Sequence, residues 1–171
     1  MAEIAVVSRL ESILDAMPKE GMRAAIVQGV VERVKEMIEE ALKAQNYTTC
    51  LANARGYCKE NYCNPKCSHI YMDKTENATI IGKFYNNPIG IELKADQAVF
   101  RTQDIKMTVA SNGIITVEYP NGEKVTVETT NMNSVYKNSY IIKYAIRKIG
   151  RPLRILLEDL VKCARENAIV C

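Results

Sequence analysis

Hydrophobic positions recur at helical spacing over the first quarter of the chain. Within residues 3–17 an apolar side chain returns every three or four positions, and Pro18 and Gly21 end the pattern. A longer stripe with the same period runs through residues 22–45, opposite a face rich in Glu and Lys. The pattern predicts two amphipathic helices, which we interpret as the cover of a sheet.

The helical period is lost over residues 47–78. This segment is polar and holds four of the six cysteines of the chain. A structureless loop of that length is uncommon inside a compact domain. We therefore expect a Cys-rich connection that is held in place through its cysteines.

Strand signals dominate residues 79–130. Within residues 105–110, for example, apolar side chains occupy every second position, as in a half-buried strand. Two Asn-Gly pairs, at 112–113 and 121–122, are strong hairpin signals because both central positions of a tight turn accept positive φ. The segment predicts an antiparallel meander of four to six strands.

Helical spacing returns after Asn138. We expect one helix to end at Ile149, because Gly150 favours a helix end and Pro152 a helix start. The next helix repeats a seam at alternating spacings of three and four, formed by Leu153, Leu156, Leu160, Cys163, Asn167 and Val170. A seam of this kind predicts a homodimer through residues 152–170. The same spacing also fits an amphipathic helix packed on its own domain.

Together these patterns predict an α+β fold, in which an antiparallel β-meander is covered by N-terminal helices and followed by a C-terminal helical hairpin. The length suits one domain over residues 1–171, which buries about 70% of its unfolded surface. Its parts are a helical cover (1–46), the Cys-rich connection (47–78), the meander (79–130), and a basic helix plus a zipper-like helix (137–171).

Charge is distributed unevenly along the chain, although the net charge is only +3. Residues 1–46 hold 6 basic and 8 acidic side chains, whereas residues 137–171 hold 8 basic and 3 acidic ones. No acidic residue occurs between Glu128 and Glu158. This asymmetry indicates a positively charged terminal module that suits an anionic partner.

The expected location is cytoplasmic. The chain starts directly with an amphipathic pattern, without the basic and apolar regions of a secretory signal. No apolar stretch reaches the roughly 18 residues needed to span a membrane. We therefore expect no membrane partner.

One face of the helix after Asn138 combines cations with aromatic rings. At 100° per residue its apolar Ile and Ala residues fall on the opposite side. The face is formed by Tyr140, Lys143, Tyr144, Arg147, Lys148 and Arg151. Because cations neutralise phosphates and tyrosine rings stack on unpaired bases, the face predicts binding of single-stranded nucleic acid. An acidic protein partner and a merely solvated helix face are the alternatives.

The cysteines allow three structural interpretations. Cys58, Cys63, Cys67 and His69 offer three thiolates and one imidazole, a donor set that satisfies tetrahedral zinc. Their spacing lacks the usual Cys-x2-Cys pairs, and the even cysteine count favours disulfides that staple the Cys-rich connection. Cys163, near the seam, fits a reduced thiol. Disulfides, zinc and free thiols all remain open.

The sequence shows no catalytic signature. His69 is the single histidine, and neither a Gly-rich phosphate loop nor an HExxH or Walker motif occurs. We therefore expect a binding protein with no catalytic residues, and with no cofactor unless zinc is bound.

The order of elements carries a resemblance to a known family. A helical cover, a Cys-containing connection, an antiparallel meander, a basic helix and the zipper-like helix Leu153–Val170 resemble the ThermoDBP-type single-stranded DNA-binding proteins of hyperthermophilic archaea. The resemblance implies a dimeric binder of single-stranded DNA, rather than RNA, from an archaeal thermophile in which intracellular disulfides are expected. The alternative is a structural, viral or assembly protein that oligomerises through its last helix and contacts an acidic partner.

Overall fold

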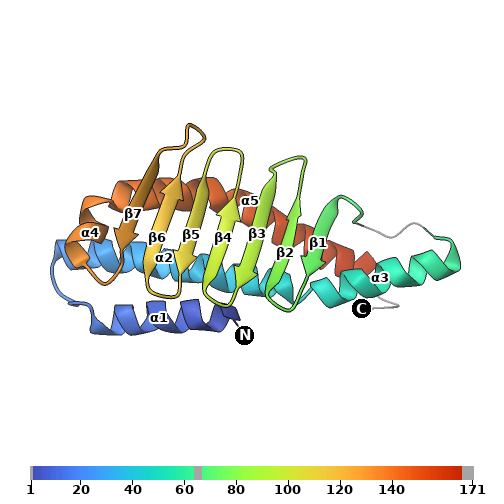
Figure 1. The fold of residues 1–171 in the computed structure, drawn as a ribbon, viewed down its shortest axis with the longest axis horizontal. Coiled ribbons are helices and arrows are strands. Elements are labelled where there is room, and N and C mark those ends of the chain that lie inside the picture. The colour runs from blue at the N-terminus through green and yellow to red at the C-terminus, as the bar shows by residue number, and fades with distance from the viewer. Residues whose placement is uncertain (1, 64–66, 167–171) are drawn as a thin grey trace.

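The computed structural model describes residues 2–63 and 67–166 and shows two layers (Figure 1). Seven strands lie side by side in one antiparallel sheet, and helices α2 (Met22–Gln45) and α5 (Ser139–Glu166) run behind it across the strands. Helix α1 (Ala2–Ala16) packs beside α2 along the lower edge of the sheet in this view. The predicted α+β class, with a meander and N-terminal helical cover, is confirmed.

The sheet is a simple meander, because its strands are neighbours in the order in which they follow along the chain. The meander predicted for residues 79–130 contains six strands, within the expected four to six, and the sheet gains a seventh strand from the Cys-rich connection. The strands are β1 (Ile70–Lys74), β2 (Ala78–Lys83), β3 (Ile89–Lys94), β4 (Gln97–Arg101), β5 (Lys106–Ala110), β6 (Ile114–Glu118) and β7 (Lys124–Glu128).

The hydrophobic core lies between one face of the sheet and the helices. In the middle of the sheet, Ile91 of β3 stands opposite Ile81 of β2 and Phe100 of β4, and all three side chains are fully buried. The strands alternate, so every second residue faces the other way, as the pattern of β3 shows. No helix of the described residues covers that second face (Figure 1). Within the described part of the chain, this second face of the sheet is therefore open.

The C-terminal region is one helix and not the predicted helical hairpin. Helix α5 continues through Gly150 and Pro152 to Glu166. Proline inside a helix costs about 3 kcal/mol. The helix continues because Ile149, Leu153 and Leu156 on either side are fully buried in the core, and each such side chain contributes about 1.5–3 kcal/mol on burial.

The predicted zipper seam packs on the chain's own domain. Leu153, Leu156, Leu160 and Cys163 are all fully buried within this single chain, so their side chains are not exposed to a partner helix. Asn167 and Val170 lie outside the described residues. The interpretation as an amphipathic helix packed on its own domain is confirmed for the described part of the seam.

The Cys-rich connection contains regular structure that the prediction missed. It forms helix α3 (Thr48–Asn61) and strand β1, separated by an undescribed segment at 64–66. A short apolar stripe explains the helix, because Leu51, Ala54 and Cys58 share one buried side at helical spacing. The remaining helix, α4 (Met132–Lys137), joins β7 to α5, and the Asn131 side chain caps it by accepting a hydrogen bond from the Ser134 N–H.

Candidate nucleic-acid interface

The apolar and the polar residues of helix α5 lie on opposite faces, as predicted. Ile141, Ile142, Ala145, Ile146 and Ile149 are buried. Tyr140 is 70% exposed, and Lys143, Arg147 and Arg151 are exposed as well. Tyr144 and Lys148 are half-buried. The six predicted site residues therefore lie on one helix, but they fall into two groups with different neighbours.

The first group is a tyrosine cluster at the sheet edge, formed by Tyr119, Tyr140 and Tyr144. The Tyr144 ring lies 6.2 Å from the ring of Tyr119, centroid to centroid, and the two planes are tilted by 35°. Burial raises the pKa of the Tyr119 phenol, and the neighbouring Tyr140, Tyr144 and Glu123 raise it further. The raised pKa keeps the Tyr119 phenol neutral near pH 7, and the rings of the cluster offer stacking surfaces.

Two cations of α5 border the tyrosine cluster. The Arg147 guanidinium carbon lies 5.8 Å from the centroid of the Tyr144 ring, and the Lys148 ammonium lies 5.6 Å from it. Both distances are within the range of cation–π attraction, which is worth about 0.5–1 kcal/mol at exposed sites. The contacts hold positive charge beside the ring, where a phosphate attached to a stacked base would lie.

The second group lines a groove between α2 and α5. The groove has a volume of about 510 Å³, and its charged lining consists of the cations Arg33, Lys43, Arg147, Arg151 and Arg154 and the carboxylate Glu40. Arg33 pairs with Glu36 on its own helix. Among the described residues, the other four cations form no ion pair. The groove is therefore a concave surface with uncompensated positive charge.

A smaller hollow of about 320 Å³ adjoins the groove near the start of both helices. Its lining is mostly apolar and includes Ile26, Val30 and Ile146, with Lys143 and Arg147 at its rim. Gly29 contributes no side chain, and a Cβ there would meet no atom within 4 Å. Cations therefore border an apolar surface on which a planar group can rest.

Four cationic or aromatic residues of this interface were not predicted from the sequence. One is Arg154, on the exposed side of α5, and the other three belong to other parts of the chain. Arg33 and Lys43 belong to α2, and their charges look like those of any solvated helix face. Tyr119 lies in the turn between β6 and β7, immediately before Pro120 and one of the Asn-Gly pairs. Only the packing of α2 and the sheet edge against α5 brings these three residues to the predicted face.

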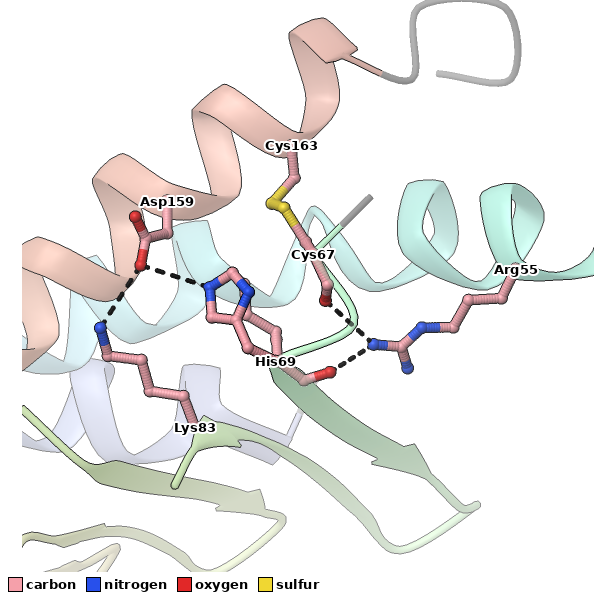
Figure 2. Close-up of polar contacts among 7 residues, drawn as sticks. Arg55, Cys67, His69, Lys83, Asp159 and Cys163 are labelled. Atoms are coloured by element: carbon pink, nitrogen blue, oxygen red, sulfur yellow. Dashed lines mark hydrogen bonds and ion pairs between the residues drawn. A yellow bond between two sulfur atoms is a disulfide. The ribbon is translucent and has the colours of Figure 1, made fainter. Parts of the chain in front are cut away.

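The cysteines form disulfides instead of the alternative zinc site. Cys58 is bonded to Cys63, with 4.5 Å between their Cα atoms. Cys67 is bonded to Cys163, with 5.9 Å between their Cα atoms, and Figure 2 shows this second disulfide. Three of the four candidate zinc ligands are therefore engaged in bonds to other sulfur atoms. The interpretation of Cys163 as a reduced thiol is wrong, and none of the described cysteines is free. The described residues contain no cluster of three metal-ligating side chains.

His69, the fourth zinc candidate, belongs to a polar cluster that fastens the sheet to α5 (Figure 2). Its Nε2 lies 3.6 Å from Oδ2 of Asp159, and the same oxygen accepts a hydrogen bond of 3.4 Å from Nζ of Lys83. The Lys83 side chain is only 4% exposed. Near the start of β1, Arg55 of α3 donates hydrogen bonds to the backbone carbonyls of Cys67 and Ile70. The cluster and the Cys67–Cys163 disulfide together hold α3, β1 and α5 at one end of the molecule.

Comparisons of this chain with protein-family models, with curated proteins and with solved structures find no match. The resemblance to ThermoDBP-type proteins therefore stays a prediction.

Proposed function

We propose that this protein binds single-stranded nucleic acid, without catalysing a reaction on it, through the groove between α2 and α5 and the adjoining tyrosine cluster. The observation that carries the proposal is the convergence of five cations from two helices on one groove, beside three clustered tyrosines. Neither helix alone supplies this combination of charge and aromatic surface.

The groove provides the phosphate contacts. Cations that neutralise phosphates release condensed counterions, which lowers the affinity as salt rises by about 0.7 log units per decade of salt for each phosphate of a single strand. Arg147, Arg151 and Arg154 follow one another along the exposed side of α5, facing Arg33 of α2. A backbone lying along the helix pair would meet these charges in succession.

The tyrosines provide the preference for single strands. Stacking on a ring requires a base whose faces are not already covered by its neighbours in a duplex, and each stacked base contributes about 1–3 kcal/mol. Tyr140, which is 70% exposed, is the ring best placed to receive one. We propose DNA ahead of RNA because the family that the chain resembles binds DNA.

The proposed location is the cytoplasm, where nucleic acid is present. No helix of the described residues has the length and apolar character needed to cross a bilayer. Disulfides persist inside cells mainly in hyperthermophilic organisms. A cytoplasmic nucleic-acid-binding protein with these disulfides therefore fits the thermophilic origin that the resemblance implies.

The rival proposal, assembly through the last helix, has less support because the described seam residues are buried within the chain. A binding experiment distinguishes nucleic acid from an acidic protein as the partner of the groove. We would titrate a labelled single-stranded oligonucleotide and its duplex with the protein at two salt concentrations, following fluorescence anisotropy. The proposal expects tighter, salt-sensitive binding of the single strand.

A charge-matched pair of variants locates the site. Arg147→Ala should reduce the slope of log affinity against log salt by about 0.7. Arg165→Ala removes the same charge from an exposed position of α5 outside the groove and should leave the slope nearly unchanged. If the two variants behave alike, the groove is not the phosphate site, and if the wild-type protein binds neither oligonucleotide at low salt, the proposed function is wrong.

A further inference from the structure

A second aromatic group lies on the open face of the sheet, and the proposed function does not use it. Tyr71 of β1 and Phe84, which follows β2, are stacked with their ring centroids 4.5 Å apart and an angle of 29° between the planes. Phe84 is 68% exposed and its neighbour Tyr85 is 78% exposed. Two large aromatic side chains in adjacent positions are thus presented to solvent.

Part of this arrangement has a purely structural cause. Tyr71 stands opposite Gly82 on β2, which in turn stands opposite Gly90 on β3. A Cβ at Gly82 would lie 2.5 Å from the Tyr71 hydroxyl, so the ring rests over the space that these glycines leave empty. Covering glycine with a cross-strand aromatic ring stabilises sheets. This explains Tyr71, but it does not explain the exposure of Phe84 and Tyr85.

The neighbouring strands place cations in the same cross-strand row of the sheet as Tyr71. In the same row of the sheet, Arg101 of β4 stands opposite Gly90, and Lys106 of β5 stands opposite Arg101. Burial raises the pKa of Tyr71, and the positive charge of Arg101 opposes that rise, which reflects its closeness to the ring. Lys106 pairs with Glu118, whereas Arg101 has no ion pair among the described residues.

This aromatic and cationic surface is continuous with the proposed interface. A hollow of about 180 Å³ at the same edge of the sheet is lined by Arg101, Lys106 and Tyr119, together with Glu118, the ion-pair partner of Lys106. Tyr119 belongs to the tyrosine cluster with Tyr144 of α5. The turns after β2, β4 and β6 all lie at this edge, because the strands alternate in direction. One nucleic-acid strand can therefore pass from α5 over this edge onto the open face of the sheet.

We infer that a single strand bound by α5 continues over this edge and stacks unpaired bases on Phe84 and Tyr85, with Arg101 contacting its phosphate. The inference rests on the proposed function and extends it from the helix pair to the open sheet face. Two exposed rings, and an arginine on the same sheet that forms no ion pair among the described residues, match the chemistry of bases and phosphates.

The test uses exposed rings whose removal leaves the core intact. We would measure the affinity of Phe84→Ala and Tyr85→Ala for oligonucleotides of roughly 4 to 16 nucleotides, the range of known single-strand site sizes. Each variant should bind the longer oligonucleotides about 5- to 150-fold more weakly. The urea midpoint of Tyr85→Ala should be unchanged, whereas Phe84→Ala also loses its stacking on Tyr71 and should show a slightly lower midpoint. Tyr57→Ala, on α3 and away from the path, removes an exposed ring of the same kind and should leave the affinity unchanged.

The outcomes separate the two proposals. Unchanged affinity in Phe84→Ala and Tyr85→Ala, together with weaker binding by Arg147→Ala, overturns the extension and leaves the helix-pair site in place. A change in sedimentation without a change in affinity assigns the aromatic patch to a protein contact, which also overturns the extension. No binding by the wild-type protein overturns both.

Discussion

Removing the carboxylate of Asp159 should destabilise the protein more than removing the buried ammonium that it neutralises. Lys83 is 4% exposed, and its ammonium lies 3.4 Å from Oδ2 of Asp159. In Asp159→Asn the ammonium keeps its burial and loses its counter-charge. In Lys83→Met the apolar stem is retained, the charge is removed, and Asp159, which is 33% exposed, remains hydrated.

The expected magnitudes follow from the geometry. At 3.4 Å and an effective dielectric constant of about 20, the attraction between the two charges is about 5 kcal/mol. Breaking a fully buried pair by removing one partner costs about 3–5 kcal/mol. Because Asp159 is partly hydrated, we expect Asp159→Asn to cost about 2–3 kcal/mol, which lowers Tm by about 5–10 °C for a chain of this length. Lys83→Met should cost less than about 1 kcal/mol, since replacing a buried charge by an apolar side chain is often nearly neutral.

Urea denaturation of the oxidised protein measures both variants and the double variant. The unfolding free energy of the double variant should be close to that of Lys83→Met, because no unpaired buried charge remains in either. If Lys83→Met destabilises the protein as much as Asp159→Asn, the ammonium is not a buried charge in need of a partner, and the reasoning fails.

Three further predictions concern the tyrosine cluster, the disulfides and the sheet. Tyr140→Ala should weaken single-strand binding by about 1–3 kcal/mol in anisotropy titrations without changing the unfolding free energy, because the ring is mostly exposed. Cys67→Ser should lower the unfolding free energy in urea by up to about 5 kcal/mol, because the lost bond joins cysteines 96 residues apart. Cys58→Ser opens a bond between cysteines only 5 residues apart and should cost about 2 kcal/mol. Equal losses in the two variants would contradict the loop-entropy argument. Gly82→Ala should lower Tm, since its Cβ would lie 2.2 Å from a backbone oxygen of β3, and an unchanged Tm would show that the strands can separate at no cost.

The regular parts of the fold were predictable because local pattern and final environment agree. In α1 and α2 the apolar stripe is the buried stripe, and in strands β3, β5 and β6 the alternation matches the two faces of the sheet. Two Asn-Gly pairs coincide with turns in which Gly113 and Gly122 adopt positive φ. Local propensity and tertiary burial favour the same structure at each of these places.

The failures occur where tertiary contacts outweigh local signals. Gly150 and Pro152 are local signals for a helix boundary, yet burial of the apolar side chains on both sides keeps α5 continuous. Helix α3 was missed because its stripe is short and it contains Gly56 and several polar residues. Strand β1 has only five residues and becomes recognisable through its pairing with β2.

The difference between local signals and tertiary contacts also applies to the candidate site, where the distribution of charge shows it most clearly. The whole chain has a net charge of +3, which is too small to indicate a nucleic-acid partner. The groove between α2 and α5 alone holds five cations and one carboxylate, a net charge of +4, which leaves −1 for the rest of the chain. Helix α2 comes from residues 1–46, which have an excess of acidic side chains, but Arg33 and Lys43 lie on the side of α2 that lines the groove with α5. A concave surface focuses such a charge, so association should be steered by the groove and not by the molecule as a whole. An on-rate that falls steeply with salt in the wild-type protein, and less steeply in Arg147→Ala, would show this steering.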